Sequence, residues 1–207
     1  MRHNLSLLFI FSLISTTVMS QFSISVEAGG NYSYWHPKGD GLLKTEGKTG
    51  YYIATTPSYK FNDLITTGLN LEYSNRGIVF SGFGSLNGVP VKQNITENYA
   101  RISPQIHISP FKNLAILLGP EFGFSINEFS KSMGNPSVKS ETKFLKEQDL
   151  GAVIGTRYFL KNIFLTAKYF HGFSEVSNLN YIDEQGNQIN GHQKNRNIQL
   201  GIGYRFI

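Results

Sequence analysis

Ser174 and His171 are the residues whose types come closest to a catalytic pair. A serine hydroxyl beside a histidine base can cleave an ester bond, and these two lie three positions apart. In an extended strand that spacing puts their side chains on opposite faces. Glu175 is close in sequence, but no pattern places a carboxylate where it would orient the histidine. We therefore predict no catalytic residues, and a lipid-active enzyme is only the third functional hypothesis.

Charged residues that alternate with apolar ones form a second candidate site. They are Glu27, Glu72, Glu97, Arg101, Glu121, Asp149, Arg157, Lys168 and Arg205. If they face a common interior, their charges must pair or stay hydrated, because an unpaired buried charge is very costly. Two hypotheses follow for this lumen charge network. The favoured one is a salt-bridged plug, and the other is a narrow path for ions or protons.

Metal and cofactor sites are not predicted. The chain has no cysteine, which excludes a thiolate metal site and a disulfide framework. Asp183, Glu184 and His192 could contact a cation, although a solvated loop tip explains them more simply. The glycines at 151, 155, 201 and 203 are followed by no helix and so form no phosphate loop. We expect them to make room for long side chains in a crowded interior.

The elements that hold these residues are predicted to be strands, and the clearest is 196–207. One face carries Ile198, Leu200, Ile202, Tyr204 and Phe206, and the other carries Asn197, Gln199, Gly201, Gly203 and Arg205. This two-residue period is typical of a strand with one apolar and one polar side. We expect its free edge to pair with the first strand and close a barrel whose apolar face contacts lipid.

Eight such segments follow one another along the chain. They span about 22 to 35, 50 to 61, 64 to 80, 95 to 109, 113 to 127, 146 to 159, 162 to 175 and 194 to 206. The predicted fold is all-β: an eight-stranded antiparallel up-and-down transmembrane β-barrel. The interior of such a barrel is just wide enough for side chains, so open-pore conduction is not expected. A soluble barrel with its apolar residues inside is the alternative.

The connections between these segments alternate between long and short. Short ones fall at Asn62-Asp63, at 110–112 and at Leu160-Lys161, and the long ones fall at 36–49, 81–94, 130–145 and 176–193. Short turns at one rim and long loops at the other are typical of outer-membrane barrels. Both termini should then be periplasmic. Within the long loops, Asn87-Gly88 and the stretch 184–187 are candidate hairpin turns.

Aromatic residues gather near both ends of the strands. Near the short-turn rim we expect Tyr59, Phe61, Phe111, Tyr158, Phe159, Phe164, Tyr204 and Phe206, and near the loop rim Tyr32, Tyr34, Tyr51, Tyr73, Tyr99, Tyr169 and Phe173. Two belts at the headgroup levels of a bilayer follow from this distribution.

The amino end has the pattern of an export signal. Arg2 and His3 precede an apolar stretch at 5–18, and small residues precede Gln21. We predict a cleavable signal peptide at 1–20 and a barrel domain at 21–207, with a retained anchor as the alternative. The net charge is +5, but the basic residues are scattered, so nucleic-acid binding is not expected.

Several segments carry a family resemblance. They are YARISPQI, LLGPEFGF, DLGAVIGTRY, TAKYFHGFSEVSN and the closing GIGYRFI. With them the chain resembles the PorT-like outer-membrane β-barrel domain family and, more loosely, the small OmpX and OmpA barrels, which are porin-like eight-stranded proteins. The resemblance implies an outer-membrane barrel but no one activity. Barrel-assembly signals usually finish on an aromatic residue, whereas here Ile207 follows Phe206.

Together these patterns predict a monomeric barrel of the cell envelope with a structural or interaction role. Recognition would occur through the long extracellular loops. The expected partners are outer-membrane lipid, the barrel-assembly machinery at the carboxy-terminal strand, and an envelope protein at the loops. No cofactor is predicted. A narrow channel for ions or small solutes is the second hypothesis.

Overall fold

A computed structural model describes residues 21–37, 44–86, 89–132, 138–139, 146–176, 180–182, 188–190 and 193–206. The predicted signal peptide at 1–20, the Asn87-Gly88 turn and the possible cation ligands Asp183, Glu184 and His192 lie outside these residues. In this part of the chain, no helix is long and apolar enough to cross a membrane.

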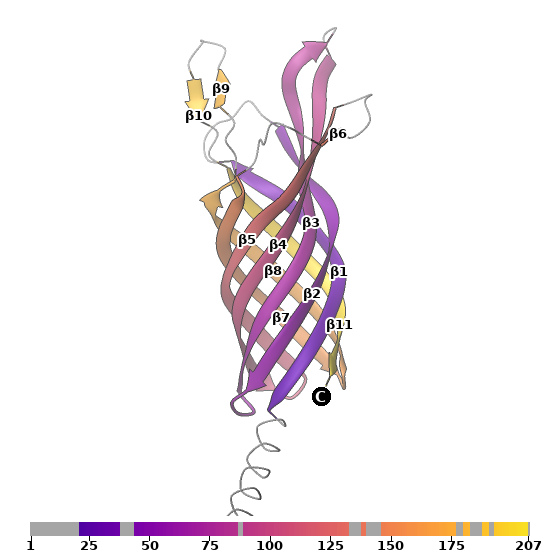
Figure 1. Ribbon diagram of the computed structural model, residues 1–207, viewed down its shortest axis with the longest axis vertical. Coiled ribbons are helices and arrows are strands. Elements are labelled where there is room, and N and C mark those ends of the chain that lie inside the picture. The colour runs from indigo at the N-terminus through magenta and orange to yellow at the C-terminus, as the bar shows by residue number, and fades with distance from the viewer. Residues whose placement is uncertain are drawn as a thin grey trace, which may run out of the picture.

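Eight long strands form one closed antiparallel barrel (Figure 1). They are β1 (Phe22–Pro37), β2 (Lys44–Lys60), β3 (Ile65–Leu86), β4 (Val89–Phe111), β5 (Leu114–Ser132), β7 (Gln148–Leu160), β8 (Ile163–Glu175) and β11 (Gln193–Phe206). Each pairs with the next, and β11 pairs with β1 from Ile24↔Phe206 to Pro37↔Gln193. The predicted closure between first and last strands is therefore confirmed.

Alternation along each strand sorts the side chains between outside and inside. Leu200 and Ile202 of β11 are 64% and 56% exposed, whereas their neighbour Gln199 is 3% exposed. The same parity puts most aliphatic residues of the other strands outward and most of their polar residues inward, while Ile78, Ile95, Leu117 and Val153 are aliphatic residues buried on the inward face. An apolar exterior around a polar interior suits lipid, and it is the reverse of the soluble-barrel alternative.

The two ends of the barrel differ, as the loop lengths predict. Tight connections join β2 to β3, β4 to β5 and β7 to β8 at one end, where β1 begins and β11 ends (Figure 1). Lys161, in the β7–β8 turn, adopts a left-handed backbone conformation with φ 61°. In the β2–β3 turn, Lys60 Nζ lies 2.6 Å from Asp63 Oδ1, and this hydrogen bond lowers the pKa of the Asp63 carboxyl. We call this the turn end and the opposite one the loop end.

The loop end carries extra β-structure. The β3–β4 ladder continues to Leu86↔Val89, which fits the hairpin predicted around Asn87-Gly88. The short strand β6 (Val138–Lys139) pairs with β5. Another short hairpin joins β9 (Asn180–Ile182) to β10 (Gln188–Asn190), around the turn predicted at 184–187.

Aromatic side chains ring the outside near both ends, with three corrections to the predicted belts. Clusters such as Tyr204–Phe206 at the turn end and Tyr51–Tyr73 at the loop end face outward. Tyr99 and Phe164, however, are fully buried inside the barrel, and Phe159 lines the interior beside Arg205. All three were assigned by their nearness to a strand end, but their parity is that of the inward face.

Glycines on the inward face leave room for large interior side chains. A Cβ added at Gly203 would lie 2.2 Å from Cζ of Phe164, and one added at Gly201 would lie 2.2 Å from the Tyr52 hydroxyl. Likewise, Gly151 adjoins the Phe170 ring and Gly155 the Lys168 side chain. The role predicted for these four glycines is confirmed. At the β1–β11 seam, a Cβ on Gly29 would lie 2.6 Å from Cα of Gly201.

We predict that Gly203→Ala destabilises the barrel by about 1–3 kcal/mol, the usual range for overpacking. The new methyl group would meet the Phe164 ring and the Val26 carbonyl oxygen at 2.6 Å. The matched control is Gly30→Ala, whose Cβ would find only the Gly50 carbonyl oxygen at 3.8 Å. Urea unfolding in lipid vesicles, followed by gel mobility without boiling, measures both. Equal midpoints for the two variants would contradict the packing argument.

Candidate functional site in the barrel interior

Arg101 lies near one end of a series of buried ion pairs in the barrel interior. Its Nη1 lies 2.5 Å from Glu121 Oε1, and its Nη2 lies 2.7 Å from Asp149 Oδ2, with all three side chains at most 3% exposed. Cζ of Arg101 also lies 4.8 Å from the centre of the Tyr99 ring and 4.5 Å from that of Phe170. The guanidinium is therefore held by two carboxylates and two aromatic faces.

Arg76 extends this series of ion pairs, and it was not among the predicted residues. Its Nη2 lies 3.6 Å from Glu121 Oε1 and 3.5 Å from Glu72 Oε1. Arg76 is therefore the link between the carboxylate that Arg101 binds and the next one. Because it lies four residues after Glu72 on the same strand, the alternation that placed Glu72 inside could also have found it.

Lys168 and Arg157 continue the series of ion pairs toward the turn end. Lys168 Nζ lies 3.3 Å from Glu72 Oε2 and 2.6 Å from Glu27 Oε1. The other oxygen of Glu27, Oε2, lies 2.7 Å from Arg157 Nη2. Gln199 Nε2 donates to Glu72 Oε1 at 2.7 Å. A continuous path of contacts thus runs from Asp149 to Arg157.

We call these eight residues the interior network. They are Glu27, Glu72, Arg76, Arg101, Glu121, Asp149, Arg157 and Lys168, and all are buried. Four carry a positive and four a negative charge, so the network is neutral as a whole. Neutrality and close contact are what a set of charges in a low dielectric requires.

Two of the predicted lumen residues lie outside this network. Glu97 is buried, and its Oε2 accepts a hydrogen bond from the Tyr99 hydroxyl at 2.5 Å. Arg205 is half-buried at the turn end, with its Cζ 4.7 Å from the centre of the Phe159 ring. Within the described part of the chain, neither residue forms an ion pair with a member of the network. Alternation placed them on the correct face but could not assign their partners.

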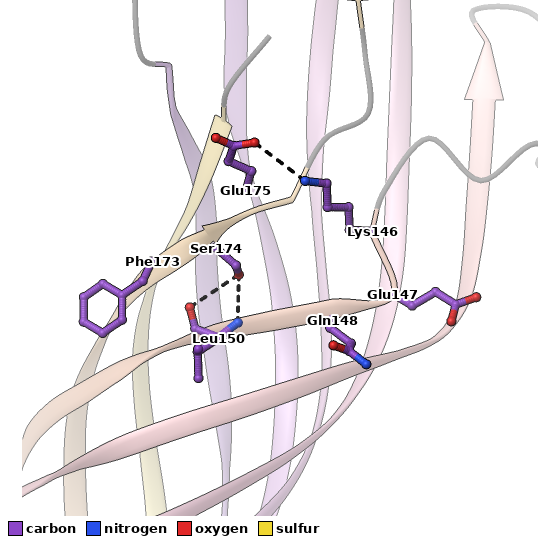
Figure 2. A pocket seen from close by; sticks show the side chains of 7 residues that line it. All are labelled: Lys146, Glu147, Gln148, Leu150, Phe173, Ser174 and Glu175. Atoms are coloured by element: carbon purple, nitrogen blue, oxygen red, sulfur yellow. Dashed lines mark hydrogen bonds and ion pairs between the residues drawn. The ribbon is translucent and has the colours of Figure 1, made fainter. Parts of the chain in front are cut away.

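The Ser174 region lies at the loop end, in a shallow depression between β7 and β8 (Figure 2). Ser174 Oγ accepts a hydrogen bond from the Leu150 backbone N–H at 2.8 Å and donates to Asp149 Oδ1 at 3.3 Å. His171 is exposed on the outer surface, with Nε2 3.0 Å from Arg196 Nη2. The serine and the histidine therefore lie on opposite faces, as their spacing predicts. At the rim, Lys146 Nζ lies 3.6 Å from Glu175 Oε2.

A closed antiparallel barrel with an apolar exterior and a charged interior defines a transmembrane β-barrel. Residues 15–178 match the family described as "Outer membrane protein beta-barrel domain", and the chain belongs to that family. It is therefore an eight-stranded barrel protein of the outer membrane. The match does not extend to anything specific to PorT-like proteins, and that finer resemblance stays a prediction.

Solved structures of similar fold agree with this assignment. Neisserial surface protein A is 13% identical, with a TM-score of 0.51, over 90% of this chain and 97% of that one. Ail, the attachment invasion locus protein of Yersinia pestis, is 16% identical, with a TM-score of 0.50, over 90% of this chain and 99% of that one. At these identities the likeness concerns the fold alone. No curated protein matches the chain.

We predict that Arg101→Met lowers the free energy of unfolding by about 3–5 kcal/mol, as expected when one partner of a buried ion pair is removed. Methionine keeps much of the side-chain volume but leaves Glu121 and Asp149 without their nearest cation. Unfolding in urea, monitored by circular dichroism in vesicles, measures the loss.

The control is Lys60→Met, which breaks the exposed ion pair with Asp63 in the β2–β3 turn. Exposed pairs contribute little, so this variant should unfold at the wild-type urea concentration. If Arg101→Met also unfolded there, the interior network would not stabilise the barrel.

Proposed function

We propose that this protein is a non-conducting outer-membrane scaffold with a structural or interaction role. The observation that carries this proposal is the interior network, in which buried side chains contact one another from Asp149 to Arg157 across the lumen. All eight strands take part, because Tyr52 and Gln199 supply contacts from β2 and β11. Such a filled interior supports a plug over an open pore.

The length of the strands supports recognition at the loop end. A tilted strand crosses the hydrocarbon with about 9–11 residues. β7 and β8 have 13 residues each, whereas β3 has 22 and β4 has 23. The surplus lies at the loop end, where the β3–β4 hairpin extends beyond the neighbouring strands (Figure 1). We propose that this hairpin and the adjoining loops contact an envelope partner, and that the protein is not an enzyme.

The proposal also includes how the protein is exported and how it is assembled in the membrane. Residues 1–20 would be removed as a signal peptide, and the mature chain would insert as a monomer with the turn end in the periplasm. The apolar outer face of β11, which ends on Tyr204 and Phe206, would be the segment that the barrel-assembly machinery binds. Lipid would cover the outer face of all eight strands.

A narrow channel is the second candidate, and it is favoured by the polar character of the lumen. Ser25, Asn70, Ser103 and Gln105 are buried there beside the interior network. Polar groups of this kind could hydrate an ion if the network opened. The scaffold and the channel differ in one measurable property, which is conductance.

We predict that planar bilayers containing the wild-type barrel show no conductance steps above the baseline. Faster gel migration without boiling would verify that the inserted protein is folded. Regular steps from the wild type would favour the channel. The assay control is a variant in which Arg76, Arg101, Glu121 and Asp149 are all changed to serine. This variant keeps the balance of charge but opens space in the lumen, and it should conduct if it inserts.

We also predict that the β3–β4 hairpin is needed for partner binding but not for folding. Replacing residues 82–91 by Asn-Gly leaves Ser81 and Lys92 paired and closes the ladder with a favoured turn. Gel mobility should therefore stay as in the wild type. Cross-linking on intact cells should lose the adduct that the wild type forms.

The matched control keeps the length of the hairpin and scrambles the order of residues 82–91. It should also lose the adduct, since recognition depends on the side chains. An adduct that survives in the shortened variant would place recognition elsewhere on the barrel.

A further inference from the structure

The lumen contains a partly open cavity of about 50 Å³ at the turn end. All eight barrel strands line it, each with residues close to the turn end. Its polar lining includes Arg157, Arg205, His107, Ser23, Ser58 and Ser109. Because strands surround it on every side, a ligand would enter through the mouth of the barrel and not from the lipid.

The charges around this cavity do not balance. Arg157 has one carboxylate partner, Glu27, and that carboxylate is also bound by Lys168. Arg205 lies outside the neutral interior network, and within the described part of the chain it has no carboxylate partner. Among the described residues, the turn end of the lumen therefore holds a surplus positive charge, and low dielectric strengthens its attraction for an anion.

Arg157 also has an unused hydrogen-bond donor. Its side chain is 3% exposed, and its Nε has no hydrogen-bond partner in the structure. Its Nη2 already donates to Glu27 and Thr56. A buried donor without a hydrogen-bond partner raises the free energy of the folded state. A ligand that accepts a hydrogen bond from this Nε would remove that cost and so bind more tightly.

Serine hydroxyls supply the remaining donors. Ser23, Ser58 and Ser109 line the same cavity as the two guanidinium groups. Arginine forks and hydroxyl groups are together suited to the oxygens of a phosphate or sulfate. The volume exceeds what one water molecule needs, yet it is too small for a lipid headgroup with its chains or for a peptide.

We propose that this cavity, the turn-end anion site, binds one small free oxyanion, with inorganic phosphate as the representative. Arg205 and Arg157 would hold its charge, and the serine hydroxyls would donate to its remaining oxygens. Arg205 is on β11 and Arg157 on β7, with β8 between them, so the bound anion would link the closing strand to the next strand but one in the wall. Binding should therefore stabilise the closed barrel.

The test measures the stability of the refolded full-length mature barrel in a neutral detergent that contains no phosphate. Inorganic phosphate is added at constant ionic strength against chloride, and the urea midpoint is read from gel mobility and circular dichroism. For one site, phosphate at ten times its dissociation constant raises the apparent folding constant about elevenfold. We expect a rise that saturates, and one bound phosphate per barrel by equilibrium dialysis.

Arg205→Gln is the decisive variant, because Arg205 lies outside the interior network and its replacement leaves every ion pair of that network in place. This variant should lose most of the phosphate-dependent rise and bind phosphate at least tenfold more weakly. Lys60→Gln, which removes a turn-end cation that does not line the cavity, should respond as the wild type does. Arg205→Lys keeps the charge but loses the fork, and it should bind with intermediate strength.

Two results would overturn the proposal. A rise that is linear in phosphate and equal in wild type and Arg205→Gln would be a general salt effect on the protein surface. Absence of bound phosphate in dialysis of the folded wild type would mean that the cavity holds only water.

Discussion

Hydrogen bonding of the backbone in lipid is the constraint on which this structure depends. Every N–H and C=O group in hydrocarbon needs an internal partner, and a sheet meets that need only when it has no free edge. Here the β1–β11 ladder removes the edge. Closure then reverses the usual distribution of side chains, because the solvent for the outer face is lipid. Most aliphatic residues go outward, and the core is built largely from polar and charged groups together with aromatic rings.

A core of this kind is stabilised by the pairing of opposite charges and by cation–ring contacts, and not by the hydrophobic effect alone. Four cations and four anions alternate along the interior network, and Tyr52, Tyr99, Phe164 and Phe170 cover the cations with their ring faces. Glycines opposite the rings of Tyr52, Phe164 and Phe170 provide the space that these rings fill. Two predicted lumen charges lie outside this balance, and they are Glu97, which accepts a hydrogen bond from Tyr99, and Arg205 at the turn end. The same principles thus explain both the filled part of the lumen and the small cavity at its turn end.

The sequence predicted which face of its strand a residue lies on, but it did not predict which interior residues form ion pairs with one another. Strict alternation in β11 predicted its outward and inward residues, and alternating loop lengths predicted which strand ends lie together. Tyr99, Phe159 and Phe164 were misplaced because nearness to a strand end was weighed above parity. Arg76 shares the parity of Glu72 but was overlooked. The pairs themselves, such as Arg157 with Glu27, depend on the register and tilt of all eight strands, and no local pattern contains that information.

The interior network also has a consequence for how the barrel forms. Glu27 and Arg157 are separated by 130 positions, and Glu72 and Gln199 by 127. Hairpins of adjacent strands can form early, but contacts over such separations come late, since the entropy of closing long loops opposes them. A half-built barrel would therefore carry charges without partners, and hydrocarbon excludes such charges. It follows that the first and last strands meet before the interior leaves water, so that insertion and closure form one cooperative event.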